Sequence, residues 1–388
     1  MNIKRFIALL IAMIMLFSLV ACNKDEKKPK ETDAEKTEAA TNGEKEPDET
    51  EEEEKEEPEN EPEFINPLTG LEVDHNISTL RPVSIMVNNI NVSLPQSGIS
   101  DADIIYECLA EGGITRLMMI SNDWEKLPNI GSCRSARDYY IDYSESYNCI
   151  FIHAGGSTYA YDTLAARGTD NIDGVRGPSG NMFYRDQDRI NSGYSYEHTL
   201  FIYDGAAIKS TIESVGYSTT KAEGYEEPVN LMPWGETATL DNEAKHIKVV
   251  MSNYQVVDYV YDEDAGEYLR WQYSGMPHMD YGADKQLAFE NVVVMFNDSG
   301  AIAGDEKNRI WMQTTGTGTG YYITDGTYEE ITWQKDAHDS PIKFFYSDGT
   351  EVEFNRGKTM INVVNNAYKS NMVFDNDTYL LDALEENE

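Results

Sequence analysis

The sequence has 388 residues, 40% of them hydrophobic, and a net charge of −38 at pH 7. Nucleic acid and anionic lipid surfaces would be repelled by so acidic a chain at long range, so neither is expected as a general partner.

The first 22 residues combine a basic start with a short apolar run. Lys4 and Arg5 precede an apolar stretch at 6–17, and Leu19-Val20-Ala21-Cys22 closes the segment. About a dozen apolar residues are too few to cross a bilayer, which takes about 20. The pattern resembles a bacterial lipoprotein signal peptide. We therefore expect residues 1–21 to be removed and a lipid on Cys22 to hold the protein at the outer face of the cell membrane. A transmembrane anchor and an ordinary secretion signal are the alternatives.

Residues 22–63 are predicted to be the lipidated cysteine and a disordered acidic tether. Residues 23–63 contain 19 acidic and 7 basic side chains and almost nothing to bury, so they cannot offset the entropy lost on ordering. Subtracting the −12 of this segment and the +2 of residues 1–22 leaves −28 for residues 64–388. Arginines close together in so acidic a segment are either paired locally or available to an anionic ligand.

The rest of the chain is long enough for two domains. We predict a mixed α+β protein, with an N-terminal α/β domain at 64–221 that contains a mixed sheet. An antiparallel β-rich domain is expected at 243–366, followed by an acidic tail at 367–388.

The N-terminal domain is expected to begin with a buried strand and a hairpin. The strand at 82–87 ends at Asn88, where sheets of this class place ligand groups. The hairpin strands at 104–110 and 114–121 are joined by Glu111-Gly112-Gly113, whose glycines supply a positive φ. Arg116 lies on an apolar strand face and needs a partner, for which Glu107 and Glu111 are the candidates. A ligand contact is the alternative.

A helix is predicted from Arg134, with Ser132 as its cap. Its core face is formed by Ala136, Tyr140, Tyr143 and Tyr147 at helical spacing. Arg134 and Arg137 would then lie in the first turn, where the helix dipole disfavours cations unless an anion binds between them. Neutralisation by Asp138 and nearby acids is the alternative.

The next strand, at 147–153, ends at His153 and turns into another helix through Gly155, Gly156 and Ser157. Such a turn presents backbone N–H groups and a hydroxyl to an anion. His153 could act as a general base, although a structural role is the commoner one. Ser157 is not expected to be a nucleophile, because the G-x-S-x-G pattern is absent.

The polar segment at 168–198 lacks hydrophobic periodicity and is predicted to be a functional loop over this site. Cys108, Cys133 and Cys149 match neither a disulfide framework nor a zinc pattern, so no metal or cofactor is expected. A disulfide involving Cys133 is a minority alternative.

Short alternating runs separated by Asn, Asp and Gly fill the second half and predict an antiparallel meander, sandwich or barrel. The runs lie at 246–251, 256–261, 268–273, 292–296, 309–313, 321–323, 330–334, 342–346, 351–354 and 360–364. The glycine-rich stretch at 316–320 imitates a nucleotide-binding loop but lacks a following helix, so it is predicted to be a flexible hairpin connection. His278 and Asp280 could orient each other or bind a ligand, with a structural turn as the favoured alternative.

Long motifs in the chain resemble the YerB-type lipoproteins of Gram-positive bacteria, which are defined by DUF3048 domains of unknown function. The motifs are RPVSIMVNN, LPQSGISDADIIYE, EGGITR, RSARDYY, HAGGS, SGMPHMD and EVEFNRGKTMINVV. The resemblance covers residues 64–366 and implies a two-part ectodomain without naming a reaction. The motif positions are Asn88, Gln96, Glu107, Glu111, Arg116, Arg134, Arg137, His153, Gly155, Gly156, Ser157, His278 and Asp280. Cys133 departs from the pattern, where valine is expected.

Two functional classes follow. The preferred one is a non-catalytic envelope module that binds an anionic wall component or a surface protein through Arg116, Arg134 and Arg137. The alternative is an extracytoplasmic enzyme acting on wall polymers, with Glu111 or His153 transferring protons. Solute capture for a transporter is less well supported. Both main hypotheses predict that Glu111, the three arginines and His153 meet in one cleft.

Overall fold

The computed structural model describes residues 64–221, 232–235 and 240–376. Cys22, the predicted tether and the part of the predicted C-terminal tail from 377 onward lie outside these ranges. The beginning of the tail predicted at 367–388 is described and contains a 3₁₀ helix, Asn366–Asn371, and a strand, Val373–Asp375. No helix among the described residues has both the length and the apolar composition needed to cross a membrane.

The first strands follow the sequence prediction closely. β2 (Ile104–Leu109) and β3 (Thr115–Ser121) form the expected antiparallel hairpin, and Gly112 and Gly113 in its connection have φ values of 73° and 77°. β1 (Val83–Asn88) pairs antiparallel with β3 and parallel with β5 (Ile150–His153). These strands therefore form the mixed sheet predicted for the N-terminal half.

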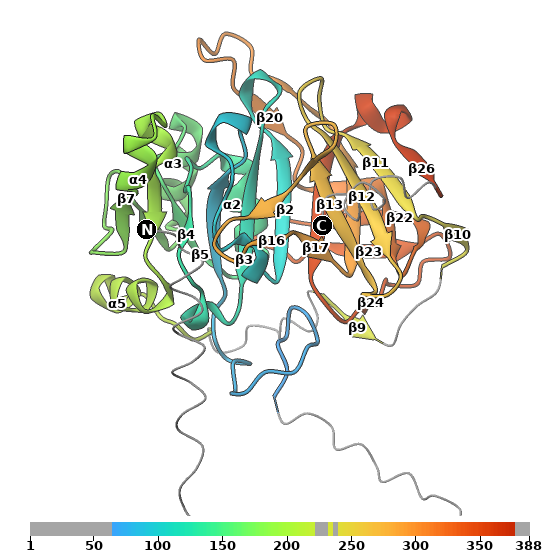
Figure 1. Cartoon of the computed structure of the whole chain (residues 1–388), viewed down its shortest axis with the longest axis horizontal. Helices are drawn as coiled ribbons and strands as arrows, with labels where there is room; N and C mark the ends of the chain where they lie inside the picture. The colour runs from blue at the N-terminus through green and yellow to red at the C-terminus, as the bar shows by residue number, and fades with distance from the viewer. Residues whose placement is uncertain (1–63, 222–231, 236–239, 377–388) are drawn as a thin grey trace, which may run out of the picture. The chain divides into compact units, whose positions relative to one another are not determined.

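This sheet continues without interruption into strands of the second half (Figure 1). The strand order is β10 (Asn242–Glu243), β22 (Thr327–Lys335), β21 (Gly316–Thr324), β18 (Asn291–Asn297), β25 (Thr359–Asn365), β2, β3, β1, β5 and β6 (Asn171–Asp173), with β23 (Lys343–Tyr346) beside β22. Strand β25 connects the two halves of the sheet, because it pairs in parallel with β18 on one side and with β2 on the other. The second half is thus not purely antiparallel. The domain boundary expected at 221–243 stays a prediction, and part of it lies outside the described residues.

A smaller sheet packs on one face of the large sheet. It contains β14 (Met276–Pro277), β13 (Glu267–Gln272), β12 (Val256–Asp262), β11 (His246–Val250) and β26 (Val373–Asp375), with β17 (Ala288–Phe289) beside β13. Val257 and Tyr259 of β12 share a buried cluster with Ile105 and Met119 of the large sheet. Helix α5 (Gly205–Val215) contributes Ile208 to the same cluster.

The opposite face of the large sheet is covered by α2 (Asp138–Glu145) and α3 (Thr158–Arg167). Tyr140 and Tyr143 of α2 are fully buried against Tyr106 and Met118 of the hairpin. The four residues of the predicted core face are buried, but Ala136 and Tyr147 lie outside α2, and Tyr139 and Ile141 on its other sides are buried too.

The glycine-rich stretch at 316–320 is part of strand β21, so its interpretation as a flexible connection was wrong. A Cβ added to Gly318 would lie 2.4 Å from Nε1 of Trp333, and one added to Gly320 would lie 2.5 Å from the carbonyl oxygen of Val294. The glycines keep room for the buried Trp333 and for the neighbouring strand.

Smaller elements complete the fold. They are a three-stranded sheet of β4 (Ile130–Gly131), β8 (Leu200–Ile202) and β7 (Phe183–Arg185), helix α4 (Gln187–Asn191), and the strand pairs β15 (Met279–Asp280) with β16 (Lys285–Gln286), β19 (Ser299–Ala301) with β20 (Ile310–Met312), and β24 (Phe354–Asn355) with β9 (Trp234–Gly235). The polar segment at 168–198 therefore contains strands β6 and β7, helix α4 and a 3₁₀ helix, Tyr196–His198.

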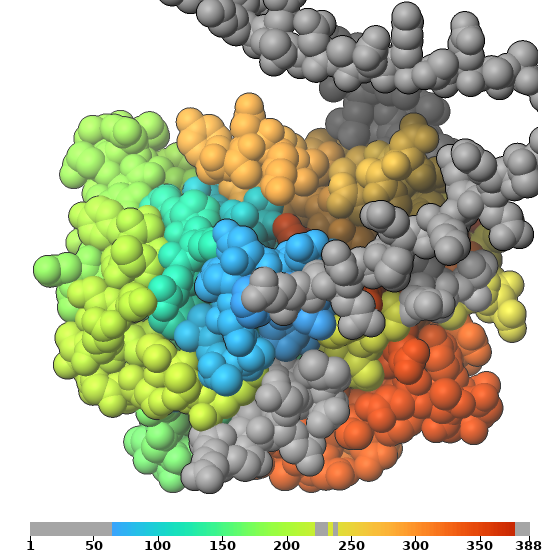
Figure 2. Space-filling view, turned by 90° about the horizontal axis from the view of Figure 1, so that it is seen from below, coloured from blue at the N-terminus to red at the C-terminus, as the bar shows by residue number. Residues whose placement is uncertain are grey.

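The residues that follow Phe64 connect the two halves. In Figure 2 these blue residues lie in the middle of the face, between green residues of the first half and yellow to red residues of the second. Asn66 donates a hydrogen bond to Asp103, and the backbone N–H of Gly357 donates to the carbonyl of Thr69.

Candidate functional site

The helix that carries the first arginine motif starts later than the sequence predicted. It begins at Asp138, with Arg137 as its N-cap residue in an extended conformation. Residues 133–136 are not helical either, because their backbone pairs with three other segments. Cys133 N–H donates to Leu200, Arg134 N–H to Met86, and the carbonyl of Arg134 accepts from Ala154. The predicted cap at Ser132 and the placement of both arginines in a first turn were therefore wrong.

Arg137 and Arg116 are grouped around Glu111. Arg137 Nε lies 3.1 Å from Glu111 Oε2, and Arg137 Nη2 contacts Oε1. Arg116 Nη2 lies 3.8 Å from Glu111 Oε1, while Nη1 donates to the carbonyl of Ser135. Of the two predicted partners of Arg116, Glu111 is the one in contact. Glu107 instead pairs with Arg270, at 2.6 Å.

This cluster is held in its charged form. Burial opposes ionisation of Glu111, but the hydrogen bond from Arg137 and the charge of Arg116 outweigh it, so the pKa of Glu111 is lowered. Burial and the charge of Arg137 lower the pKa of Arg116 to about 10. A carboxylate tied to two cations is poorly suited to general acid–base work, which needs a pKa near the operating pH.

Arg134 differs from these arginines because its guanidinium forms no hydrogen bond or ion pair with the described residues. The side chain is half-buried and lines a cavity of about 320 Å³. Burial lowers the pKa of Arg134, and the charge of Glu197 opposes the shift. Because a desolvated cation without partners is costly, it is a candidate to receive an anionic group.

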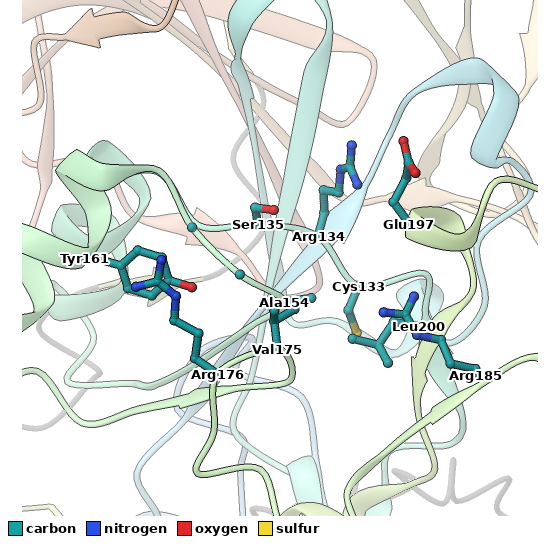
Figure 3. Close-up of a pocket in the computed structure, with 12 residues that line it drawn as sticks. Cys133, Arg134, Ser135, Ala154, Tyr161, Val175, Arg176, Arg185, Glu197 and Leu200 are labelled. Atoms are coloured by element: carbon teal, nitrogen blue, oxygen red, sulfur yellow. The ribbon is translucent and has the colours of Figure 1, made fainter. Parts of the chain in front are cut away.

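Two further arginines line the same cavity (Figure 3). Arg176 lies over the ring of Tyr161, at 3.6 Å from the ring centroid. Arg185 lies 3.9 Å from the centroid of Tyr196 and donates to the carbonyl of that residue. Arg134 and Glu197 extend to the same side of the cavity in Figure 3. The remaining lining residues are Cys133, Ser135, Ala154, Gly155, Gly156, Val175 and Leu200.

The glycine turn borders this cavity, but one of its backbone N–H groups already donates a hydrogen bond within the protein. Asp173 Oδ1 accepts from the backbone N–H groups of Gly155, at 2.7 Å, and Val175, at 2.8 Å. Asp173 Oδ2 accepts from the hydroxyl of Tyr161 at 2.7 Å. The N–H of Gly155, expected to face an anionic ligand, thus binds a carboxylate of the protein.

Three predicted site residues have structural contacts instead of lining the cavity. His153 is fully buried, with Nδ1 at 2.8 Å from the carbonyl of Gly155 and Nε2 at 3.2 Å from Asn171 Oδ1. Ser157 caps α3 by accepting from the N–H of Ala160 at 3.0 Å. The Asn88 amide is buried 2.8 Å from Nδ1 of His198.

The expected convergence is therefore partial. Arg134 lines the cavity, and its electrostatic neighbours include Glu111 and Arg137. Arg116 reaches the carbonyl of Ser135, another lining residue. His153 contacts the carbonyl of Gly155 and the ring of Tyr161, which both line the cavity, but it does not line the cavity itself.

Sequence reasoning did not single out Tyr161, Arg176, Arg185 and Glu197. The available signal was the polar segment at 168–198, which supplies the last three of these residues and was predicted to cover the site.

The described residues also bear on possible metal ligands and on the cysteine thiols. These residues include no group of three His, Cys, Asp or Glu side chains placed to hold a metal ion. Cys108, Cys133 and Cys149 are free and buried. Burial raises the pKa of Cys133 to about 12, so its thiol lacks the thiolate character that a nucleophile requires.

Both halves of the chain match families of proteins of unknown function. Residues 68–218 match the DUF3048 N-terminal domain, and residues 247–361 match the DUF3048 C-terminal domain. The chain belongs to the DUF3048 family. The family resemblance stated from the motifs is thereby confirmed.

Two comparisons agree with this assignment. The DUF3048 chain is 31% identical over 306 residues to the "Putative lipoprotein YerB" of Bacillus subtilis, which covers 77% of this chain and 85% of that protein. It is also similar to the crystal structure of the YerB protein from Bacillus subtilis, with a TM-score of 0.66 and 29% identity over 77% of this chain and 96% of the other. The mixed α+β class predicted from the sequence fits this relative.

Proposed function

We propose that this DUF3048 protein is a lipid-anchored envelope protein that binds an anionic wall component in the cavity of Arg134, Arg176 and Arg185. The observation that carries the proposal is Arg134, a half-buried guanidinium that no described residue pairs. Lipid anchoring at Cys22 on the outer face of the membrane is part of the proposal. It is supported by the lipobox and by the name of the Bacillus subtilis relative.

The balance of charge in the cavity favours an anion. Three arginines line it, and Glu197 is the one carboxylate among its lining residues. Arginine binds phosphate and carboxylate through parallel N–H donors, which makes it well suited to both. The rest of the folded chain is acidic, so this cavity is a local exception to the overall charge.

An enzyme acting on wall polymers is the second hypothesis, and the geometry favours it less. Glu111 is held as a carboxylate by two arginines, and both ring nitrogens of His153 contact protein groups. Neither side chain lines the cavity.

The proposal can be tested by pelleting with isolated Gram-positive cell walls. Full-length protein in detergent micelles is mixed with intact walls and with walls stripped of their anionic polymers. We expect Arg134→Ala to weaken pelleting by about tenfold, because a charged hydrogen bond contributes about 1.5–3 kcal/mol. Glu197→Gln should strengthen it, since it removes a carboxylate that opposes the ligand. Added salt should weaken binding.

Lys307→Ala is the control, because Lys307 is exposed and does not line the cavity. Equal pelleting of wild type and Arg134→Ala, or undiminished pelleting on stripped walls, would contradict the proposal. Soluble fragments released by the wild type and absent with the variant, detected by mass spectrometry, would establish the enzyme instead. A lack of wall binding would direct the search to a surface protein.

A further inference from the structure

A second, larger cavity lies on the other side of strand β8. Its volume is about 620 Å³. Leu200 of β8 lines the arginine cavity and Phe201 lines this one. Consecutive side chains of a strand point to opposite faces, so the two cavities are separate sites. We refer to the second one as the tyrosine groove, after Tyr194 and Tyr281 in its lining.

The tyrosine groove is assembled from distant segments that buried contacts hold in place. Tyr281 follows Asp280, whose buried carboxylate accepts from Gly98 N–H at 3.0 Å and Ser100 N–H at 2.8 Å. The same carboxylate accepts from Gly282 N–H at 2.9 Å. A Cβ on Gly282 would lie 2.4 Å from Ser97 Oγ, so the loop approaches as closely as glycine permits. The wall that carries Tyr281 is therefore fixed by the fold.

The opposite wall is stabilised by Arg189, which is 9% exposed. Its guanidinium lies 4.9 Å from the ring centroid of Tyr194 and 4.8 Å from that of Phe201. It donates to the carbonyl of Ser93 at 2.8 Å and to that of Pro95. Because Arg189 is engaged in these contacts, it holds the aromatic rings in place and does not offer a free cation to a ligand.

The groups left free in the groove are a ring, a carboxylate and small polar side chains. Tyr281 is 73% exposed, and its ring stacks on no described residue. The carboxylate of Asp188 has no hydrogen-bond or ion-pair partner among the described residues, whereas Asp186 already accepts from Asp188 N–H and Arg189 N–H. The hydroxyl of Ser192 and the side chain of Asn129 also line the groove. The amide nitrogen of Asn129 already donates to the hydroxyl of Tyr184 at 2.8 Å and to the carbonyl of Ile202 at 2.7 Å, so this residue offers its Oδ1 as an acceptor.

We propose that the tyrosine groove binds a neutral oligosaccharide. A sugar ring has an apolar C–H face, which packs on an aromatic ring, and a rim of hydroxyls, which need both donors and acceptors. Tyr281 and Tyr194 supply aromatic surface, Asp188 and Asn129 Oδ1 supply acceptors, and the hydroxyl of Ser192 supplies a donor. The carboxylates exclude an anionic chain, so this ligand differs in charge from the one proposed for the arginine cavity. The proposal stands independently of that function.

A cationic, proline-containing peptide is the competing ligand, since it too could contact aromatic rings beside a carboxylate. The lining favours a saccharide because it combines the rings with Asn129, Asp188 and Ser192, whereas recognition of proline-rich peptides relies on a largely aromatic groove.

The test is calorimetric titration of the full-length protein, in a detergent without a sugar headgroup, with triacetylchitotriose, cellotriose and a lysine- and proline-containing peptide. We expect at least one of the two sugars to bind. Tyr281→Ala should weaken that binding by about tenfold, and Tyr281→Phe should preserve it. Asp188→Asn should also weaken it, which provides a second variant on the other wall.

Tyr254→Ala is the matched control, because Tyr254 is 69% exposed and does not line the groove. Arg134→Ala should leave sugar binding unchanged, which separates this proposal from the anion site. Circular dichroism should show that the variants remain folded, since Tyr281 and Asp188 are exposed. The proposal is overturned if neither sugar binds, if Tyr281→Ala and Asp188→Asn bind sugar as tightly as wild type, or if only the peptide binds.

Discussion

The buried ion pair of Glu107 and Arg270 shows how single residues connect the two halves of the chain. Neither side chain is exposed to solvent, and Arg270 also contacts Nδ1 of His278. Burial and the charge of Arg270 hold the pKa of His278 well below its usual range. His278 is therefore neutral, with Nδ1 accepting from Arg270 and Nε2–H donating to Gln96 at 3.0 Å. His278 and Asp280 do not orient each other, because Asp280 binds backbone N–H groups instead.

Removing one member of this pair should be costly. Arg270→Met leaves the Glu107 carboxylate buried without its counter-charge, so we expect the free energy of unfolding to fall by about 3–5 kcal/mol. Urea unfolding measures the change. The double variant Glu107→Gln/Arg270→Met should recover part of the loss, since it removes the uncompensated charge. A single variant as stable as the wild type would contradict the assignment.

The burial of Lys335 leads to a prediction about how the free energy of unfolding depends on pH. Its buried ammonium donates to the carbonyls of Ala337, His338 and Ser340, at 2.9, 2.6 and 2.6 Å. Burial lowers its pKa to about 8, and the nearby charge of Asp142 opposes the shift. Between about pH 8 and pH 10.5 the unfolded chain therefore binds more protons than the folded one, so this group makes stability rise with pH.

We expect the wild type to gain about 1–2 kcal/mol relative to Lys335→Met between about pH 7.5 and pH 9.5. The buried tyrosines lower the free energy of unfolding at higher pH, which is opposite to the effect of Lys335. Their contribution is the same in both proteins, so it cancels when the two are compared. Urea unfolding across this range measures the difference. A difference that stays constant with pH would show that Lys335 keeps an ordinary pKa.

At the scale of elements, strand β21 shows how a buried tryptophan determines the neighbouring sequence. Trp333 donates from Nε1 to the carbonyl of Phe296 at 2.9 Å, across the face of Gly318. Gly318→Ala should push the indole off this acceptor, and overpacking of this kind costs about 1–3 kcal/mol. Thermal unfolding of Gly318→Ala against Thr317→Ala measures the cost, because Thr317 is exposed on the same strand. Equal midpoints for the two variants would contradict this account of the glycine.

The elements that depend on local signals could be predicted from the sequence. The hairpin was predicted from its paired glycines, and most strands of the second half were predicted from hydrophobic periodicity. The segment at 132–137 was misjudged because its conformation is set by hydrogen bonds to Met86, Ala154 and Leu200, which no local pattern records.

The candidate site could be predicted only in part for the same reason. The arginine motif and the glycine turn pointed to the region of the arginine cavity, and Arg134, Gly155 and Gly156 line that cavity. Arg176 and Arg185 lie in a segment without periodicity, and their approach to the turn depends on tertiary packing. Asp173, which occupies the Gly155 N–H, could not have been chosen from among the acidic residues near it in the sequence.

At the scale of the whole described fold, β25 makes the two halves interdependent. It lies between β18 and β2 and pairs in parallel with both, so neither the N-terminal nor the C-terminal DUF3048 segment contains all the neighbours of its own strands. The Glu107–Arg270 pair crosses the same junction. Separating the segments would expose the unpaired edges of β2 and β25 and would leave the charges of Glu107 and Arg270 without partners. Exposed strand edges and unpaired charges are both unfavourable.

We therefore expect the two segments to unfold in one cooperative step. Hydrogen exchange with mass spectrometry should give β2 and β18 the same opening free energy, because opening either strand removes a neighbour of β25. Arg270→Met should lower both values together, whereas the exposed control variant Thr317→Ala should change neither by much. If β2 opened at a much lower free energy than β18, the segments would be stable separately, and the continuous sheet would join two independently folding domains.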